Sequence, residues 1–249
     1  MDLQRLTSYL RQGIQNYNMI DDGDKIAVGL SGGKDSLAML MGLKKLSEFY
    51  PKKFQLAAIY VDIGVNYTDA EGNIIFDKNK AIQNMEAFCQ SLDVPFYAVS
   101  TQIYDIVFEM RKEKHPCSLC SRMRKSALTE KANELSCTKI AYAHHMDDFI
   151  ETSMMSLLVE GRYHSILPVT KLEEFHSAII RPMILIPEHK VISFSKKYKL
   201  PVMKNPCPAD GYTNRQEIIE WIAKNQQQFP NIKNALFSAV LKYIDEHKE

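Results

Sequence analysis

The apolar residues of this chain gather in short runs that alternate with longer stretches of helical periodicity. Runs rich in β-branched and aromatic residues predict buried strands, whereas apolar residues three and four positions apart predict amphipathic helices. The predicted strands cover 25–30, 54–63, 94–100, 138–143 and 178–186. The predicted helices cover 3–18, a segment from Lys34 through Leu46, a segment through Met85 that ends near Asp93, 102–113, 118–136, 146–161, 187–199 and two short stretches after 213.

This alternation of strands and helices favours an α/β fold with a mostly parallel sheet. Residues 64–73 and 162–178 are predicted to be irregular. In open parallel sheets, ligands bind beyond the carboxyl ends of the strands. We therefore expect the functional residues in the loops that follow residues 30, 63, 100 and 143.

The first of these loops interrupts core sequence with small polar residues, in AVGLSGGKDSLAML (27–40). A strand, a glycine-rich turn and a helix N-terminus form an anion site, because backbone N–H groups and the helix dipole both face the ligand. Ser31 and Ser36 add hydroxyl donors, and Lys34 adds a positive charge. A turn with a capping serine is the alternative, but a cap does not require six specialised residues in a row. The stretch therefore predicts a phosphate-binding loop.

This loop differs from two common phosphate-binding patterns. The Walker A motif requires glycine where this chain has Val28, and serine or threonine where Asp35 follows the lysine. The dinucleotide pattern G-x-G-x-x-G also fails, because Gly29 is followed two positions later by Ser31. The sequence thus indicates another class of nucleotide-binding loop.

A pair of cysteines, Cys117 and Cys120, stands where a helix is expected to begin, in HPCSLC (115–120). The C-x-x-C spacing brings two sulfurs into one coordination sphere, and a helix N-terminus stabilises thiolates. Three uses fit the pair. They are a redox disulfide, a zinc site with four ligands, for which His115 is a candidate, and an iron–sulfur cluster, in which three cysteines leave one iron open.

The other cysteines are of two kinds. Cys89 and Cys137 lie among apolar neighbours and are expected to be core thiols, because cysteine packs as a small hydrophobe. Cys207 lies in a loop between Pro206 and Pro208. A core thiol is the alternative there, and a third metal ligand is the favoured interpretation.

A second polar cluster follows the predicted strand 138–143, in AHHMDDFIET. Its members His144, His145, Asp147 and Asp148 are expected to face the phosphate loop across the edge of the sheet. Acidic residues in the first turn of a helix are favourable in themselves, so a plain helix start is one alternative. A mononuclear His/Asp metal site is another. Paired histidines and paired aspartates at the ligand-binding edge favour a functional role.

Composition sets limits on partners and location. The 249 residues are 45% hydrophobic and 24% charged, with a formal net charge of +1, so any nucleic-acid surface must be local. The candidate basic groups, which could also be solvated helix faces, are in 111–115 and 122–125 and at Lys196, Lys197, Lys199 and Lys204. No apolar run approaches the ~20 residues that span a bilayer. We therefore expect no membrane attachment and a cytoplasmic location.

The sequence SGGKDS resembles the PP-loop of the ATP pyrophosphatase superfamily, whose members cut ATP between its α- and β-phosphates and adenylylate a substrate. The resemblance implies a Rossmann-like parallel sheet of the adenine nucleotide alpha hydrolase type, with helices on both faces. It also implies that the loop cradles the pyrophosphate end of ATP with Mg²⁺, and that Val61–Ile63 lies near the adenine. The implied nucleotide-binding residues are Ser31, Gly32, Gly33, Lys34, Asp35, Ser36, Val61, Ile63, His144 and His145.

The order of the motifs extends this resemblance over roughly residues 20–220. A PP-loop, C-x-x-C before a basic helix, HHMDD with a following ET and a late cysteine in a proline-flanked loop resemble the tRNA 2-thiocytidine synthetase (TtcA-type) family. In that family three cysteines hold a [4Fe–4S] cluster whose fourth iron binds the sulfur to be transferred. The resemblance implies Cys117, Cys120 and Cys207 as these ligands. The chain departs from the family by having one late cysteine in place of a second C-x-x-C, which indicates a different subgroup.

The function implied by this resemblance is ATP- and cluster-dependent thiolation of tRNA, in which a pyrimidine C2 carbonyl, as in cytidine, is adenylylated and its oxygen is replaced by sulfur. The implied catalytic residues are Asp35, Asp147, Asp148 and Arg124, the last stabilising the adenylate. Expected partners are tRNA, a sulfur donor (sulfide or a cysteine desulfurase) and a second copy of the chain in a homodimer. The alternatives are a PP-loop sulfurtransferase or ligase acting on another base or a small molecule, and a non-catalytic nucleotide-binding redox sensor.

The same features divide the chain into three predicted segments. Residues 1–20 form an N-terminal helix, 21–213 form the PP-loop domain with the cysteine site, and 214–249 form C-terminal helices.

Overall fold

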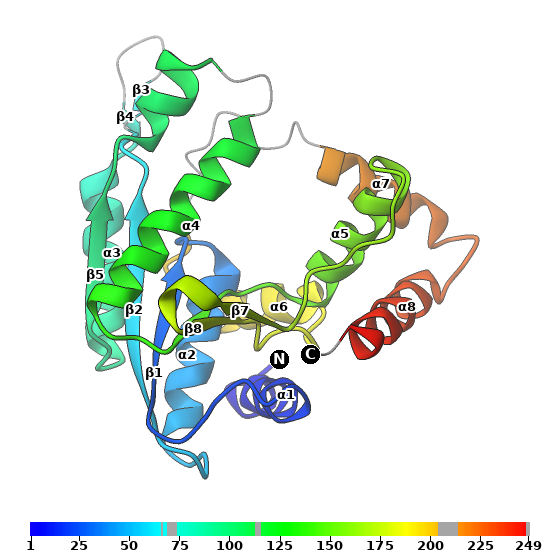
Figure 1. Ribbon diagram of the computed structural model, residues 1–249, viewed down its shortest axis with the longest axis horizontal. Coiled ribbons are helices and arrows are strands. Elements are labelled where there is room, and N and C mark those ends of the chain that lie inside the picture. Colours follow the sequence, from blue (N-terminus) through cyan, green and yellow to red (C-terminus); the bar gives the residue numbers. More distant parts are fainter. Residues whose placement is uncertain (66, 69–73, 113–115, 204–213, 248–249) are drawn as a thin grey trace.

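A six-stranded sheet lies at the centre of the computed structural model, which describes residues 1–65, 67–68, 74–112, 116–203 and 214–247. The strand order is β5-β2-β1-β6-β8-β7 (Figure 1). Neighbouring strands are parallel, except that β7 runs antiparallel to β8. The strands are β1 (Asp24–Leu30), β2 (Phe54–Asp62), β5 (Phe96–Ser100), β6 (Lys139–Ala141), β7 (Val169–Leu172) and β8 (Ser177–Ile180).

Helices precede, connect and follow these strands. They are α1 (Leu3–Asn16), α2 (Lys34–Ser47), α3 (Lys78–Ser91), α4 (Pro116–Glu134), α5 (Met146–Leu158), α6 (Glu188–Tyr198), α7 (Asn214–Asn225) and α8 (Ile232–Glu246). A π-helical turn, η1 (Asp105–Met110), precedes α4, and a 3-10 turn, η2 (Glu173–Phe175), joins β7 to β8. Two short strands, β3 (Tyr67–Thr68) and β4 (Ile74–Phe76), form a separate antiparallel pair.

Both faces of the sheet are apolar, and this is why helices cover each of them. Along β1, Ile26 and Val28 belong to the core shared with α1, α2 and α6, whereas Ala27 belongs to the core shared with α4. The alternation follows from the strand period of two. On the α5 side, Ile218 of α7 packs with Met154 of α5 in a smaller cluster. The α/β class with a mostly parallel sheet is as predicted, and the division into three segments stays a prediction.

Two predicted elements at the end of the sheet are wrong. The strand predicted over 178–186 ends at Ile180, because Pro182 has no N–H for a ladder and the chain turns, with the Ile184 N–H donating to the Arg181 carbonyl. The segment predicted as irregular, 162–178, contains β7, a four-residue strand too short to show a clear period. The part of the sequence after 180 therefore forms a turn beside the carboxyl end of β8.

Two other predicted segments contain a different kind of secondary structure from the one expected. The helix predicted over 102–113 is the π-helical turn η1, and the predicted loop 64–73 includes β3. Within the residues that the model describes, none of the helices has the length and apolar character needed to cross a membrane.

Candidate nucleotide and cysteine site

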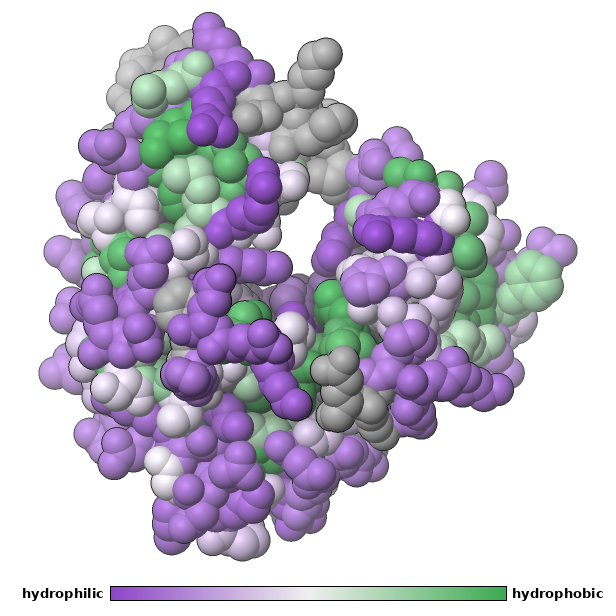
Figure 2. Space-filling view, in the orientation of Figure 1, coloured by the Kyte–Doolittle hydropathy of each residue, from purple (hydrophilic) through white to green (hydrophobic). Residues whose placement is uncertain are grey.

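A cleft of about 450 Å³ opens at the carboxyl ends of β1, β2 and β6. Figure 2 shows this face of the molecule hollowed, with mostly hydrophilic residues around the hollow. The cleft brings together residues from motifs far apart in the sequence. The predicted site residues that line it are Ser31, Asp35, Ser36, Val61, Cys117, Cys120, Arg124, His144 and Asp148.

The remaining predicted site residues are placed differently. Cys207, and with it the candidate zinc ligand His115, lies outside the described residues. Those that lie near the cleft without lining it are Gly32, Gly33, Lys34, Ile63, His145 and Asp147. The structure thus joins the phosphate loop, the cysteine pair and part of the HHMDD motif in one space.

Ser31 and Ser36 stabilise the shape of the phosphate loop through hydrogen bonds within it. The Ser36 hydroxyl accepts from the Ser31 N–H (3.2 Å) and donates to the Gly33 carbonyl (3.1 Å), and the Ser31 hydroxyl accepts from the Gly33 N–H (3.2 Å). Gly33 caps α2 without a side-chain hydrogen bond. The N–H groups of the first turn of α2 therefore remain available to an anion, as the sequence predicts for a phosphate loop.

Gly32 is required by the path of the loop. Its φ of +75° lies in the left-handed region, and a Cβ there would stand 2.4 Å from the Met203 Cε. The Met203 N–H donates to the Gly32 carbonyl (2.9 Å). The chain therefore enters the segment that contains Cys207 directly beside the phosphate loop.

We expect Gly32→Ala to lower nucleotide affinity about tenfold or more, because a left-handed alanine is strained by about 1–2 kcal/mol and the strain falls on the loop that binds phosphate. Gly23→Ala is the matched control, since Gly23 has a φ of +83° and open space around it, far from the loop. Calorimetric titration with ATP and thermal unfolding would separate the two effects. Both variants should lose similar stability, and equal losses of ATP affinity in the two would contradict the assignment of the loop.

Lys34 turns away from the cleft and pairs with carboxylates. Its Nζ lies 3.1 Å from Asp35 Oδ2 and 2.9 Å from Glu188 Oε1. Burial alone would lower the pKa of Lys34, but Asp35 and Glu188 together outweigh it and raise this pKa. The ammonium stays charged and ties α2 to α6.

Asp35 belongs to the phosphate-loop motif SGGKDS, and its two carboxylate oxygens have different surroundings. Oδ1 is buried and has no hydrogen-bond partner within the described part of the chain, and His145 Nε2 lies 3.9 Å away. Burial raises the pKa of Asp35 above its ordinary value, against the opposing effects of His145 and Lys34. A buried oxygen short of positive charge fits a Mg²⁺ ligand, since hard cations take carboxylate oxygens.

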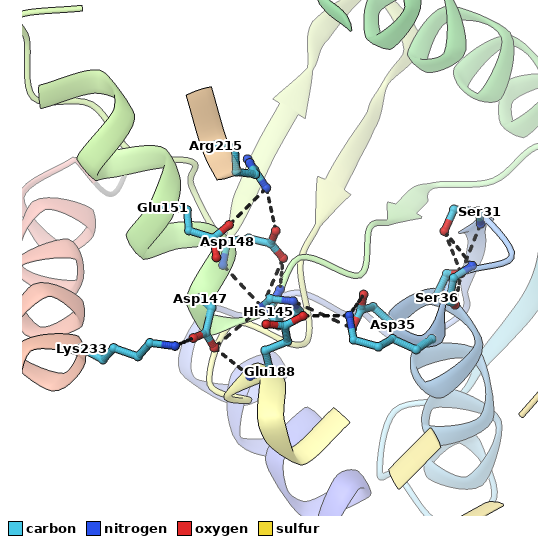
Figure 3. A network of polar contacts seen from close by, with 12 residues as sticks. Ser31, Asp35, Ser36, His145, Asp147, Asp148, Glu151, Glu188, Arg215 and Lys233 are labelled. Carbon is cyan, nitrogen blue, oxygen red and sulfur yellow. Dashed lines mark hydrogen bonds and ion pairs between the residues drawn. The ribbon is translucent and has the colours of Figure 1, made fainter. Parts of the chain in front are cut away.

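His145 and Asp148 cap the start of α5. The Asp148 N–H donates to His145 Nδ1 (3.4 Å), and the His145 N–H donates to Asp148 Oδ2 (2.9 Å). The other oxygen of Asp148 accepts from Arg215 Nη1 (2.8 Å), at the beginning of α7 (Figure 3). The carboxylate of Asp148 is thereby held at the wall of the cleft opposite Asp35.

Asp147 points the other way from Asp148. It accepts from Lys233 of α8 and from the Glu188 N–H (2.7 Å) of α6. Burial alone would raise the pKa of Asp147, but these two donors outweigh it and lower this pKa. The geometry favours a structural role for Asp147, which joins α5 to α6 and α8, over the catalytic role expected from the sequence.

Glu151 is buried behind Asp148, and the sequence analysis includes it only as part of the ET that follows HHMDD, without a role of its own. Arg215 Nη1 lies 3.6 Å from its carboxylate. Burial raises the pKa of Glu151 to about 7, with Asp148, Asp147 and Glu188 adding to the effect and Arg215 opposing it. The signal available in the sequence was its position on α5, one turn after Asp147 and Asp148.

We expect Glu151→Gln to stabilise the protein at alkaline pH. A raised folded-state pKa means that the ionised form is penalised in the fold. The penalty is absent below the unfolded value near 4.5, grows as the pH rises, and is complete above about 7. The free energy of unfolding should therefore increase by about 1–3 kcal/mol at pH 8 and change little at pH 4.5. Urea titrations at the two pH values test this, with Glu86→Gln on the exposed face of α3 as control. An equal change at both would contradict it.

The cysteine pair begins α4 on the far side of the cleft. Cys117 is exposed and Cys120 is half-buried, and both line the cleft together with Arg124, one helical turn further on. Residues three apart on a helix lie on one side, so the two thiols can bind one inorganic centre. Cys89 and Cys137 are buried in the core, as predicted, and burial raises the pKa of Cys89 to about 12.

A parallel sheet whose first strand runs through a glycine-rich turn into an uncapped helix N-terminus defines a nucleotide-binding α/β protein. Residues 4–226 match the model of a family described as the PP-loop domain. The chain belongs to this family, which confirms the resemblance stated from its motifs.

Two individual relatives show which kind of PP-loop protein the chain is similar to. The chain is 31% identical over 247 residues to a tRNA-cytidine(32) 2-sulfurtransferase of Pelobacter propionicus, covering 98% of this chain and 87% of that protein. It is 32% identical over 249 residues to a protein of the same name from Marinomonas, covering 98% and 83%.

Solved structures confirm the fold class. The U34-tRNA thiolase NcsA from Methanococcus maripaludis, solved with its [4Fe-4S] cluster, aligns with a TM-score of 0.77 at 25% identity, covering 99% of this chain and 79% of that one. An NH3-dependent NAD synthetase from Campylobacter jejuni aligns with a TM-score of 0.50 at 15% identity, covering 99% and 95%, and shares the fold.

Proposed function

We propose that this protein is an ATP-dependent tRNA sulfurtransferase that replaces the C2 oxygen of a cytidine with sulfur and uses a [4Fe–4S] cluster. The observation that carries the proposal is the shared cleft, in which Ser31 and Ser36 of the phosphate loop face the same space as Cys117 and Cys120. Relatives named tRNA-cytidine(32) 2-sulfurtransferase favour cytidine 32 of tRNA as the substrate.

The chemistry needs two steps at one carbon. The C2 carbonyl oxygen attacks the α-phosphorus of ATP, so that an O–P bond forms and pyrophosphate leaves. Sulfide then attacks C2, and the C–O bond breaks with the oxygen departing on AMP. Adenylylation converts a poor leaving group into a good one, and both steps need negative charge to be neutralised.

The chain supplies groups for that charge. The N-terminal N–H groups of α2 and the Ser31 hydroxyl bind phosphate oxygens, and Ser36 contributes by holding Ser31 and Gly33 in the shape of the loop. Asp35, whose Oδ1 has no hydrogen-bond partner among the described residues, and Asp148 would hold Mg²⁺, which would supply positive charge against that of the phosphates. Arg124 lines the cleft one helical turn after Cys120 and stabilises the adenylate.

The cluster would be held by Cys117, Cys120 and Cys207, and when bound it supplies a site for the sulfur atom to be transferred. The spacing of Cys117 and Cys120 on α4 fits two of its ligands. Support for Cys207 comes from the sequence and from the contact of Met203, four residues earlier, with the phosphate loop.

Partners follow from the same chemistry. Arg124 and Lys125 at the cleft and the lysines of α6 are candidate contacts for tRNA phosphates. The target base must leave its stack to enter the cleft. Sulfide or a cysteine desulfurase as donor, a homodimer and a cytoplasmic location complete the proposal.

The test is thiolation by the protein purified without oxygen. The preparation should be brown, carry about four iron and four sulfide per chain, and convert cytidine to 2-thiocytidine in tRNA only with ATP, Mg²⁺ and sulfide. Nucleoside mass spectrometry reads the product. Colourless protein with stoichiometric zinc would overturn the cluster. Nucleotide binding without turnover would favour the redox sensor, and thiolated uridine would move the activity to another base.

A further inference from the structure

Two neutral side chains, Tyr142 and His144, line the cleft directly after β6. The family resemblance implies nucleotide binding for His144, whereas Tyr142 has no role in the chemistry described so far. Their ring centroids lie 5.8 Å apart. The cationic groups of the cleft and the N-terminus of α2 can bind the phosphates. A pair of uncharged rings in the lining of the same cleft points to a different part of the substrate, the base.

His144 is fixed in one tautomer by Arg181. Arg181 Nε lies 3.3 Å from His144 Nδ1, and an arginine Nε–H can only donate. His144 Nδ1 must therefore accept, which places the ring hydrogen on Nε2. Burial lowers the pKa of His144 to about 4, against the opposing effect of Asp148 and with the support of Arg181, Arg215 and Lys125, so the ring stays neutral at physiological pH.

Arg181 is itself held rigidly. Its side chain is buried, at 6% exposure, and Nη1 donates to the Leu167 carbonyl and to Thr170 Oγ1 (3.0 Å). These bonds fix the guanidinium behind His144, on the turn that replaces the predicted continuation of β8. Arg181 does not line the cleft, so it acts through His144.

Tyr142 presents a hydroxyl that lacks a partner. The oxygen is buried and makes no hydrogen bond within the described residues. The ring lies beside Gly29 of β1, where an added Cβ would stand 3.6 Å from Tyr142 Cε1. Burial raises the pKa of Tyr142 to about 12, so the hydroxyl keeps its proton. An unsatisfied buried hydroxyl costs free energy that a ligand acceptor would recover.

We propose that the Tyr142 hydroxyl and the His144 Nε2–H form a pair of neutral donors that holds the acceptor edge of the pyrimidine to be thiolated, with Arg181 as a positioning residue. The inference rests on the proposed function and names the part of the protein that binds the base. An unpaired cytosine carries a carbonyl oxygen and an adjacent ring nitrogen, both acceptors and both uncharged. Neutral donors match these groups, whereas phosphates suit the charged groups elsewhere in the cleft.

The test compares two anticodon stem-loop RNAs, one with cytidine and one with an abasic site at position 32, bound to the holoenzyme with a non-hydrolysable ATP analogue. The wild type should prefer the cytidine RNA. Tyr142→Phe should reduce this preference about three- to tenfold, the range for one neutral hydrogen bond, and leave affinity for the abasic RNA unchanged. Tyr60→Phe, a buried tyrosine of β2 outside the cleft lining, is the matched control.

A second readout concerns the tautomer. Nitrogen NMR of ¹⁵N-histidine-labelled holoenzyme, with seven histidines and His144→Gln for assignment, should place the His144 hydrogen on Nε2. Arg181→Met should shift it toward a mixture of tautomers and reduce the preference for cytidine RNA. Arg181→Lys removes the Nε–H and should behave similarly.

The possible outcomes distinguish a failure of the donor pair from a failure of the proposed function. If the wild type thiolates the cytidine RNA but Tyr142→Phe keeps the full preference, or His144 carries its hydrogen on Nδ1, the donor pair is wrong and the proposed function stands. Weaker binding of the ATP analogue with an unchanged preference would also overturn it, because the pair would then face the nucleotide. A cluster-loaded wild type that does not thiolate would contradict the proposed function and, with it, this inference.

Discussion

Serine in place of Cys117 or Cys120 is expected to abolish thiolation while ATP still binds. Both thiols line the cleft from the first turn of α4, and a hydroxyl does not replace a thiolate as an iron ligand. Each variant should lose most of its about four irons per chain. Iron and sulfide analysis, calorimetric titration with ATP and nucleoside mass spectrometry of tRNA measure the three effects.

Cys137→Ala is the matched control for the cysteine variants. Cys137 is 6% exposed and packs in the core beside α4, so its loss should lower stability and spare the cluster. Cys207→Ser should behave like Cys117→Ser if Cys207 is the third ligand. A Cys117→Ser protein that retains its iron and its activity would contradict the assignment of the pair.

Asparagine in place of Asp35 is expected to lower the thiolation rate by about 10²–10³ and to raise the Mg²⁺ concentration needed for half-maximal rate. The buried Oδ1 has no partner among the described residues, which fits a cation ligand. Because burial raises the pKa of Asp35, the ionised side chain is disfavoured in the fold. The variant should therefore be at least as stable as the wild type at neutral pH, so lost activity cannot be ascribed to unfolding.

The control for Asp35→Asn is Asp24→Asn, at the opposite end of β1. Asp24 is 6% exposed and accepts from the Thr138 hydroxyl (2.6 Å) and the Asp21 N–H (2.7 Å). Its replacement should lower stability and leave the Mg²⁺ dependence unchanged. Equal Mg²⁺ dependence in Asp35→Asn and the wild type would contradict the ligand role of Asp35.

Strong local patterns made the sheet and the phosphate loop predictable. A buried strand, two glycines and a helix in 27–40 fix the chain path whatever surrounds them, and the order of strands and helices places that turn at the carboxyl edge. The strand predicted over 178–186 extends too far because apolar content alone does not reveal that Pro182 ends the ladder.

Side-chain direction was the part of the site that sequence could not provide. Asp147 and Asp148 are neighbours in the sequence, but consecutive residues on a helix face about 100° apart. Asp148 therefore lines the cleft, whereas Asp147 accepts a hydrogen bond from Lys233. The partners of the two aspartates, Arg215 and Lys233, come from segments far along the chain and carry no motif.

Tyr142 was missed for a related reason. It stands within AYAHH, two residues before the first histidine, where an aromatic residue suits the end of a buried strand equally well. Its place in the cleft lining, with a buried hydroxyl that has no hydrogen-bond partner among the described residues, marks it as a candidate contact with substrate.

The fate of the base oxygen tests most directly the claim that the base is activated by adenylylation before sulfur replaces its oxygen. A stem-loop RNA with ¹⁸O at C2 of its target cytidine would be thiolated by the cluster-loaded protein under anaerobic conditions with ATP, and the AMP would be analysed by mass spectrometry. The account predicts one ¹⁸O in AMP for each 2-thiocytidine formed. Thiolated RNA accompanied by AMP without ¹⁸O would show that the oxygen leaves by another route and would contradict the account.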